Sequence, residues 1–182
     1  MWSFVALVLL SVCQSAGSAT EPSATVASSR IPADRLDQYS DLAVTWMQEY
    51  LRVDTTNPPG NEMRGVAFYK KILDQEGIEN RAFEYAPGRG DLWARLPRNS
   101  GSRAGDQNSH PGAQDATRVG HPRPIILLNH MDVVTSDASH WKVPPFSGEI
   151  RDGYIWGRGA QDMKDEGLAQ LVVMVMLKRE KV

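Results

Sequence analysis

Residues Pro124 to Val134 read PIILLNHMDVV, and the fold of the chain depends on this stretch. Four consecutive aliphatic residues, Ile125 to Leu128, are typical of a strand that is buried on both faces of an α/β sheet. His130 and Asp132 follow, and residues two apart in an extended chain point to the same side. Open α/β sheets place their sites at the carboxyl ends of strands. The pair therefore predicts either a surface turn or a metal ligand with a supporting carboxylate.

Helices and short strands surround this stretch. The spacing of apolar residues predicts helices over residues 33–53 and 62–77, which the helix-breaking sequence DTTNPPGNE separates. Two short strands, NRAFEYA and DLWARLP, follow, and a hairpin is expected to turn at residues 151–153. A last helix over residues 162–180 has an apolar middle and a basic C-terminal end. This order favours an α/β layered fold.

A second motif, GRGAQDMK, spans Gly157 to Lys164. Its glycines allow close approach of the backbone, but their spacing differs from that of phosphate-binding fingerprints. Asp162 lies at the start of the last predicted helix. An aspartate there serves either as an N-cap, worth about 1 kcal/mol, or as a metal ligand. Taken alone, the motif leaves both interpretations open.

Taken together, LLNHMDVV, Trp141 and PPFSGEIRDGYIWGRGAQDMK resemble the co-catalytic zinc peptidases. This family includes aminoacylases, acetylornithine deacetylase, succinyl-diaminopimelate desuccinylase and glutamate carboxypeptidase. LRVDTTNPPGNE and DLWARLP resemble the segments that precede the family's metal-binding strand, so the resemblance runs from about Arg35 to Glu180. It implies a three-layer α/β/α zinc-peptidase catalytic domain, of which residues 32–182 would hold the N-terminal part.

The resemblance implies roles for three residues. His130 resembles the histidine ligand of one zinc ion, and Asp162 resembles the aspartate that bridges both zinc ions. Asp132 resembles the catalytic-site aspartate that orients the metal-bound histidine. The implied cofactor is a pair of zinc ions, although imidazole and carboxylate donors also accept cobalt or manganese. The resemblance further implies a cis peptide bond between Asp162 and Met163.

The implied activity is hydrolysis of an amide or peptide bond, as in a carboxypeptidase, dipeptidase or aminoacylase, on a small peptide or an N-acyl amino acid. The family's Glu-Glu pair, which supplies the general base and a zinc ligand, has no counterpart before Val182. The acidic pair Asp165-Glu166 comes too early and falls in the first turn of the last helix, where acids favour the helix dipole. We therefore expect an N-terminal fragment that is inactive alone, with a homodimer formed through a missing domain. The alternative is a non-catalytic binding or assembly domain that keeps the family fold.

Other polar residues have simpler interpretations. His110 and His121 fall in a polar insertion over residues 98–123, which contains almost no large apolar side chains. His140 is expected to be solvated, and Trp141 to pack against the hairpin. Arg158 is expected to brace the glycine loop and not to bind a substrate carboxylate.

The N-terminus predicts export. FVALVLLSVC, Phe4 to Cys13, is apolar but too short to span a bilayer, and small residues follow it. We predict a signal peptide over residues 1–19 and a linker over 20–31, with lipoprotein cleavage at Cys13 or an uncleaved anchor as alternatives. The protein would then be secreted or periplasmic, with no membrane contact after signal removal. The chain has one cysteine, so a metal site would need His, Asp and Glu ligands. A net charge of -2 gives no electrostatic case for nucleic acid as a partner.

Overall fold

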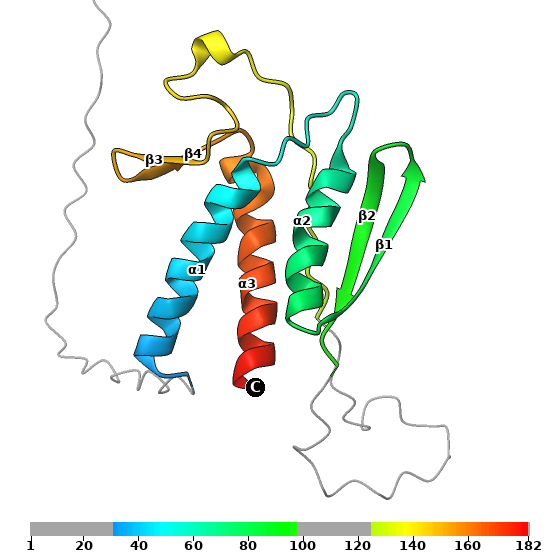
Figure 1. Ribbon diagram of the computed structural model, residues 1–182, viewed down its shortest axis with the longest axis vertical. Coiled ribbons are helices and arrows are strands. Elements are labelled where there is room, and N and C mark those ends of the chain that lie inside the picture. The colour runs from blue at the N-terminus through cyan, green and yellow to red at the C-terminus, as the bar shows by residue number, and fades with distance from the viewer. Residues whose placement is uncertain (1–30, 98–124, 182) are drawn as a thin grey trace, which may run out of the picture. The chain divides into compact units, whose positions relative to one another are not determined.

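The computed structural model describes residues 31–97 and 125–181 (Figure 1). The predicted signal peptide, the predicted linker apart from its last residue, and the predicted polar insertion lie outside the described residues. The described part contains helices and antiparallel strand pairs, in the order helix, helix, hairpin, extended segment, hairpin, helix.

The helices are α1 (Ala33–Leu51), α2 (Glu62–Gln75) and α3 (Asp165–Glu180). The first two begin where the sequence predicted and end two residues earlier, whereas α3 begins three residues later, after a distorted turn, η3 (Ala160–Lys164). Asn61 stands at the N-cap of α2, but its side chain makes no capping hydrogen bond. None of the helices in the described ranges combines the length and the apolar character needed to cross a bilayer.

The core lies where the apolar faces of the helices meet. In Figure 1, α1 runs beside α3, and the two helices are in contact. The buried apolar side chains of the core are Tyr39, Met47, Tyr50 and Leu51 from α1, Tyr69, Ile72 and Leu73 from α2, Ile78, and Leu168, Leu171, Val172 and Val175 from α3. The predicted apolar stripe of the last helix is therefore a core face, apart from Val173, which is exposed.

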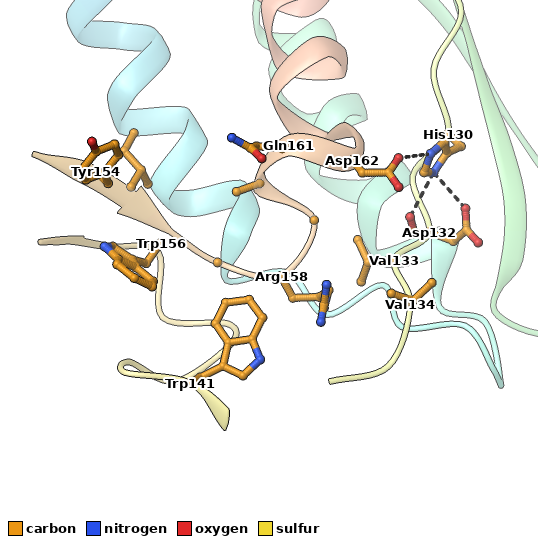
Figure 2. A pocket seen from close by; sticks show the side chains of 14 residues that line it. His130, Asp132, Val133, Val134, Trp141, Tyr154, Trp156, Arg158, Gln161 and Asp162 are labelled. Carbon is orange, nitrogen blue, oxygen red and sulfur yellow. Dashed lines mark hydrogen bonds and ion pairs between the residues drawn. The ribbon is translucent and has the colours of Figure 1, made fainter. Parts of the chain in front are cut away.

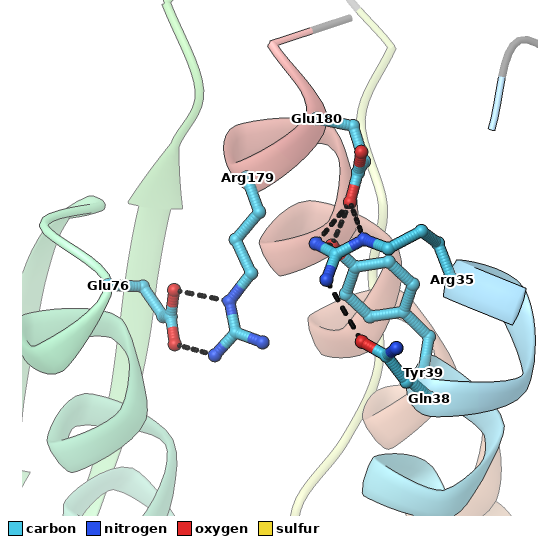
Figure 3. A network of polar contacts seen from close by, with 6 residues as sticks. All are labelled: Arg35, Gln38, Tyr39, Glu76, Arg179 and Glu180. Carbon is cyan, nitrogen blue, oxygen red and sulfur yellow. Dashed lines mark hydrogen bonds and ion pairs between the residues drawn. The ribbon is translucent and has the colours of Figure 1, made fainter. Parts of the chain in front are cut away.

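Polar contacts tie the C-terminal end of α3 to the other two helices (Figure 3). The Glu180 carboxylate accepts hydrogen bonds from the Arg35 guanidinium and from the Tyr39 hydroxyl, both at 2.6 Å. On the other side, Arg179 donates two hydrogen bonds to the carboxylate of Glu76, one of them at 2.9 Å. These contacts fix the position of α3 along α1 and α2.

Two antiparallel hairpins accompany the helices. β1 (Glu79–Ala86) pairs with β2 (Arg89–Arg95), and α2 packs against both strands. β3 (Glu149–Arg151) pairs with β4 (Tyr154–Trp156), and the two connecting residues, Asp152 and Gly153, both have positive φ angles, 54° and 80°. Two positive φ angles match the twist of the flanking strands in a tight hairpin. The predicted turn is therefore confirmed.

The prediction of a buried strand at Ile125 to Leu128 is wrong for the described structure. The segment belongs to neither hairpin, and Ile125, Ile126 and Leu128 are 87%, 83% and 82% exposed. Its continuation makes one parallel bridge, between Thr56 and Val133. A buried parallel strand needs neighbours on both sides, and within the described residues no strand pairs with this segment. The mixture of helices and strands is compatible with the α/β class, whereas the three-layer arrangement stays a prediction.

Candidate metal centre

The backbone around His130 is held by the loop that follows α1. Beside the bridge to Thr56, the amide of Val133 donates to the carbonyl of Thr55 at 3.1 Å. The Thr55 hydroxyl donates to the carbonyl of Met131 at 2.6 Å, and Thr55 is fully buried. These bonds place His130 and Asp132 on an extended stretch of defined direction, as the sequence predicted.

Asp162 comes from the turn η3, between β4 and α3. Its φ and ψ angles of -139° and 89° are not helical, and the Asp162–Met163 peptide bond is cis, as the resemblance implied. Gly159 stands before this turn with a φ of +80°, and a Cβ added there would lie 2.3 Å from Cγ1 of Val133. A glycine is therefore needed for η3 to approach the stretch that carries His130.

Lys164 holds the same turn against the C-terminal end of α1. Its ammonium group donates to the carbonyls of Tyr50 and Val53, at 3.0 and 2.6 Å, where α1 ends. The residue is 1% exposed, and burial lowers the pKa of its amine to about 8. The sequence analysis gave Lys164 no role, because a lysine in a polar motif is normally exposed. Its only sequence signal is its place directly before a helix with an apolar face.

The structure brings the three predicted site residues together (Figure 2). Nε2 of His130 lies 3.0 Å from Oδ1 of Asp162, and Nδ1 of His130 lies 3.1 Å from both the carbonyl and Oδ1 of Asp132. The amide of Asn57 donates to Oδ2 of Asp132 at 3.1 Å. Burial acts to lower the pKa of His130, but the hydrogen bond to Asp162 and the contacts with Asp132 outweigh it, so this pKa is raised.

These donors fit part of a zinc site. Imidazole nitrogen and carboxylate oxygen are usual zinc donors, and a carboxylate on the second ring nitrogen is the usual partner of a ligating histidine. The side chains of His130 and Asp162 are 46% and 88% exposed, so a cation has access to both. Within the described residues, however, no group of three or more His, Cys, Asp or Glu side chains is arranged to hold a metal ion. The described site is therefore incomplete, and the predicted roles stay predictions.

A pocket of about 520 Å³ opens beside these donors (Figure 2). His130, Asp132 and Asp162 line one part of it. The sequence analysis did not assign the remaining lining residues to the site, and these are Val133, Val134, Trp141, Tyr154, Ile155, Trp156, Gly157, Arg158, Gly159, Ala160 and Gln161. The pair Asp165-Glu166 stands in the first turn of α3, as predicted, and does not line the pocket. A few convergent polar side chains in a pocket lined by aromatic rings are typical of a ligand-binding site.

Comparison with known proteins gives the family. The family model for peptidase family M20/M25/M40 matches residues 126–182, the segment that contains His130, Asp132 and Asp162. This segment is similar to the peptidases of that family, and the resemblance that the sequence suggested is confirmed.

Several curated relatives extend the match. Aminoacylase-1 from Sus scrofa is 32% identical over 139 residues, which cover 76% of this chain and 30% of the relative. An N-fatty-acyl-amino acid synthase/hydrolase PM20D1 from Xenopus tropicalis is 60% identical over 42 residues, 23% of this chain and 8% of the relative. A succinyl-diaminopimelate desuccinylase from Bradyrhizobium sp. (strain ORS 278) is 48% identical over 62 residues, 31% of this chain and 16% of the relative. The chain thus spans less than a third of the length of these relatives.

Proposed function

We propose that this chain supplies part of the metal centre of a zinc-dependent hydrolase of amide bonds. In this proposal His130 is a ligand of one zinc ion, Asp162 is the carboxylate shared by two zinc ions, and Asp132 orients the His130 ring. The observation that carries the proposal is the distance of 3.0 Å between Nε2 of His130 and Oδ1 of Asp162, residues that stand 32 positions apart. The match of this segment to a zinc-peptidase family supports the same assignment.

The surroundings of His130 suit this role. Both groups near its Nδ1, the carbonyl and the carboxylate of Asp132, are acceptors, so Nδ1 carries the proton. Nε2 also faces an acceptor, Oδ1 of Asp162, so it donates a proton to that oxygen in this contact. Loss of this proton would leave the lone pair of Nε2 on the side of Asp162, where a cation would be bound. Asn57 holds the Asp132 carboxylate in place through its amide. When bound, zinc activates water and polarises the amide carbonyl.

The substrate class follows from the relatives' names. Because aminoacylase-1 and an N-fatty-acyl-amino acid synthase/hydrolase are similar to this chain, we propose an N-acyl amino acid or a small peptide as the substrate. The remaining ligands and the general base would come from residues outside the described part, within a three-layer α/β/α catalytic domain. On this proposal the chain alone does not hydrolyse substrate. Export by the predicted signal peptide to a secreted or periplasmic location, and a homodimer, belong to the same proposal.

The test uses the complete gene product that contains this chain. We expect wild-type protein to hold about two zinc ions per chain and to hydrolyse N-acyl amino acids. His130→Ala should lower the metal content to about one ion and reduce hydrolysis by at least about 100-fold, because a ligand of the reacting centre is removed. Metal content is read by mass spectrometry of the purified protein, and hydrolysis by release of the free amine.

His140→Ala is the matched control, since His140 is exposed on the short helix η2 (Ala138–His140) and lies outside the pocket. It should change neither zinc content nor hydrolysis. Full zinc content and full hydrolysis in His130→Ala would refute the assignment. A wild-type protein that binds no zinc and hydrolyses none of the substrates would instead support a non-catalytic binding or assembly domain.

A further inference from the structure

Lys164 is a buried residue that the proposed function does not use. It is 1% exposed, although lysine is among the residues that are least often buried. Its ammonium group lies 4.6 Å from the centre of the Tyr50 ring and donates to the carbonyls of Tyr50 and Val53. Lys164 is the last residue of η3, which contacts α1 (Figure 1). The lysine therefore holds the turn that carries Asp162 against the end of α1.

Asp162 depends on the backbone of η3 for its position. Its side chain is 88% exposed, so packing against neighbouring side chains restricts the carboxylate little. Its φ and ψ angles of -139° and 89° are not helical, so the regular geometry of α3 does not extend to it. The carboxylate nevertheless lies 3.0 Å from Nε2 of His130. Whatever fixes the turn η3 therefore also fixes this distance.

The loop after α1 is a common support for both predicted ligands. The carbonyl of Val53 accepts a hydrogen bond of 2.6 Å from Lys164, two residues after Asp162. Two positions further along the loop, Thr55 is fully buried and makes two hydrogen bonds to the stretch that carries His130. Because both sets of bonds end in the same short segment, the separation of His130 and Asp162 depends on the Lys164 side chain as well as on Thr55.

We propose that Lys164 is a positioning residue of the metal centre, which fixes the Asp162 carboxylate at the distance from His130 at which both side chains bind zinc. The proposal rests on the proposed function and adds a residue that touches neither metal nor substrate. Hydrogen bonds from an ammonium group are strong where water is excluded. Without them, η3 is free to move away from the end of α1, and the Asp162 carboxylate moves with it.

A purely structural role of Lys164 would give a different result. In that case Lys164 would only stabilise the fold, and another variant with a similar loss of stability would bind zinc in the same way. Val175 supplies this comparison, because it is fully buried in the core face of α3. It stands 11 positions after Lys164, which corresponds to about 16 Å along a helix axis. A change at Val175 therefore lowers stability without reaching η3.

The experiment measures zinc affinity on the complete gene product. Lys164→Met keeps an unbranched apolar stem and removes the donor group. We expect the zinc dissociation constant to rise about 10- to 100-fold, as for other groups that orient metal ligands. In zinc-saturated protein, kcat should fall by about 10-fold or more while KM changes less than about 3-fold, because the substrate contacts are kept. Affinity is read by competition with a chromogenic chelator, at a temperature where circular dichroism shows each variant to be folded.

Val175→Ala is the matched control. It should lower the midpoint of urea unfolding, because it leaves a cavity in the core, and keep the zinc dissociation constant within about 2-fold of wild type. Lys164→Gln, whose shorter side chain still has an N–H donor, should recover part of the affinity that Lys164→Met loses. An unchanged zinc dissociation constant in Lys164→Met would overturn the proposal. An equal rise in Val175→Ala would also overturn it, since lost stability alone would then weaken zinc binding.

The role of Lys164 and the proposed function fail in different ways. If Lys164→Met does not fold, Lys164→Gln takes its place, and a zinc dissociation constant equal to that of wild type would overturn the proposal. A protein that loses zinc with His130→Ala, yet binds it as wild type in the Lys164 variants, would refute the role of Lys164 alone. A wild-type protein that binds no zinc would refute the proposed function, and the role of Lys164 with it.

Discussion

Replacing Gly159 with alanine tests how closely η3 must approach the stretch that carries His130. Gly159 has a φ of +80°, and its added Cβ would lie 2.3 Å from Cγ1 of Val133, a separation that real structures do not show. The neighbour cannot yield easily, because Val133 is 3% exposed and bridges to Thr56. Either the turn or the His130 stretch must move.

The expected cost has two parts. A side chain in the left-handed conformation costs about 1–2 kcal/mol, and forcing an extra methyl group into packed surroundings costs about 1–3 kcal/mol. We therefore expect Gly159→Ala to lower the free energy of unfolding of the chain by about 2–5 kcal/mol. The measurement is urea unfolding followed by circular dichroism, with the midpoint and slope compared to wild type.

Gly153→Ala is a close control, because Gly153 has the same φ of +80° but no atom within 4 Å of its added Cβ. It should lose only the conformational part, about 1–2 kcal/mol. Val133→Ala removes Cγ1, the atom with which the added Cβ would clash. Gly159→Ala should therefore lower the free energy of unfolding less in the Val133→Ala variant than in wild type. Equal losses for the two glycine variants, with no effect of Val133→Ala on the difference, would refute the reasoning.

Two other variants test the anchors of α3. Lys164→Ala removes a buried side chain and leaves the carbonyls of Tyr50 and Val53 without their donor. The free energy of unfolding should therefore fall by about 2–5 kcal/mol. A change in the urea midpoint equivalent to less than about 1 kcal/mol would contradict the anchoring role. Hydrogen bonds from Tyr39 and Arg35 lower the pKa of Glu180 below its usual 4.5. The charged Glu180 carboxylate therefore stabilises the folded state fully above about pH 4.5, and this stabilisation is lost as the pH falls through the lowered pKa of the folded state. Acid unfolding curves should therefore drop more steeply for wild type than for Glu180→Gln, and parallel curves would count against this contact.

Local patterns predicted the helices and the second hairpin well. Apolar residues at helical spacing placed α1 and α2 within two residues of their observed ends, because the breaking sequence between them acts locally. Asp152-Gly153 predicted the hairpin turn, since both residues adopt positive φ readily. These features depend on neighbours in the sequence, which a single chain displays directly.

Contacts between distant segments were not predicted in the same way. Ile125 to Leu128 have the composition of a buried strand, but burial requires partner strands, and within residues 31–97 and 125–181 none pairs with them. Lys164 looks like a surface lysine, yet the end of α1 supplies two carbonyls that hold it inside. The ring of Trp141 beneath Arg158 is equally invisible in a linear reading, because 17 positions separate them.

The sequence by itself indicated the family and predicted His130 and Asp162 as metal ligands, because the motifs around them keep characteristic residue types at a characteristic spacing. It also determined the local elements, whose signals are short in range. Only the tertiary structure decided that Nε2 of His130 and Oδ1 of Asp162 lie 3.0 Å apart and that Asp132 stands on the other ring nitrogen. It alone placed Arg158 in the same pocket. The reason is that these distances depend on how η3, the extended stretch and α1 pack, and packing is set by side chains far apart in the chain.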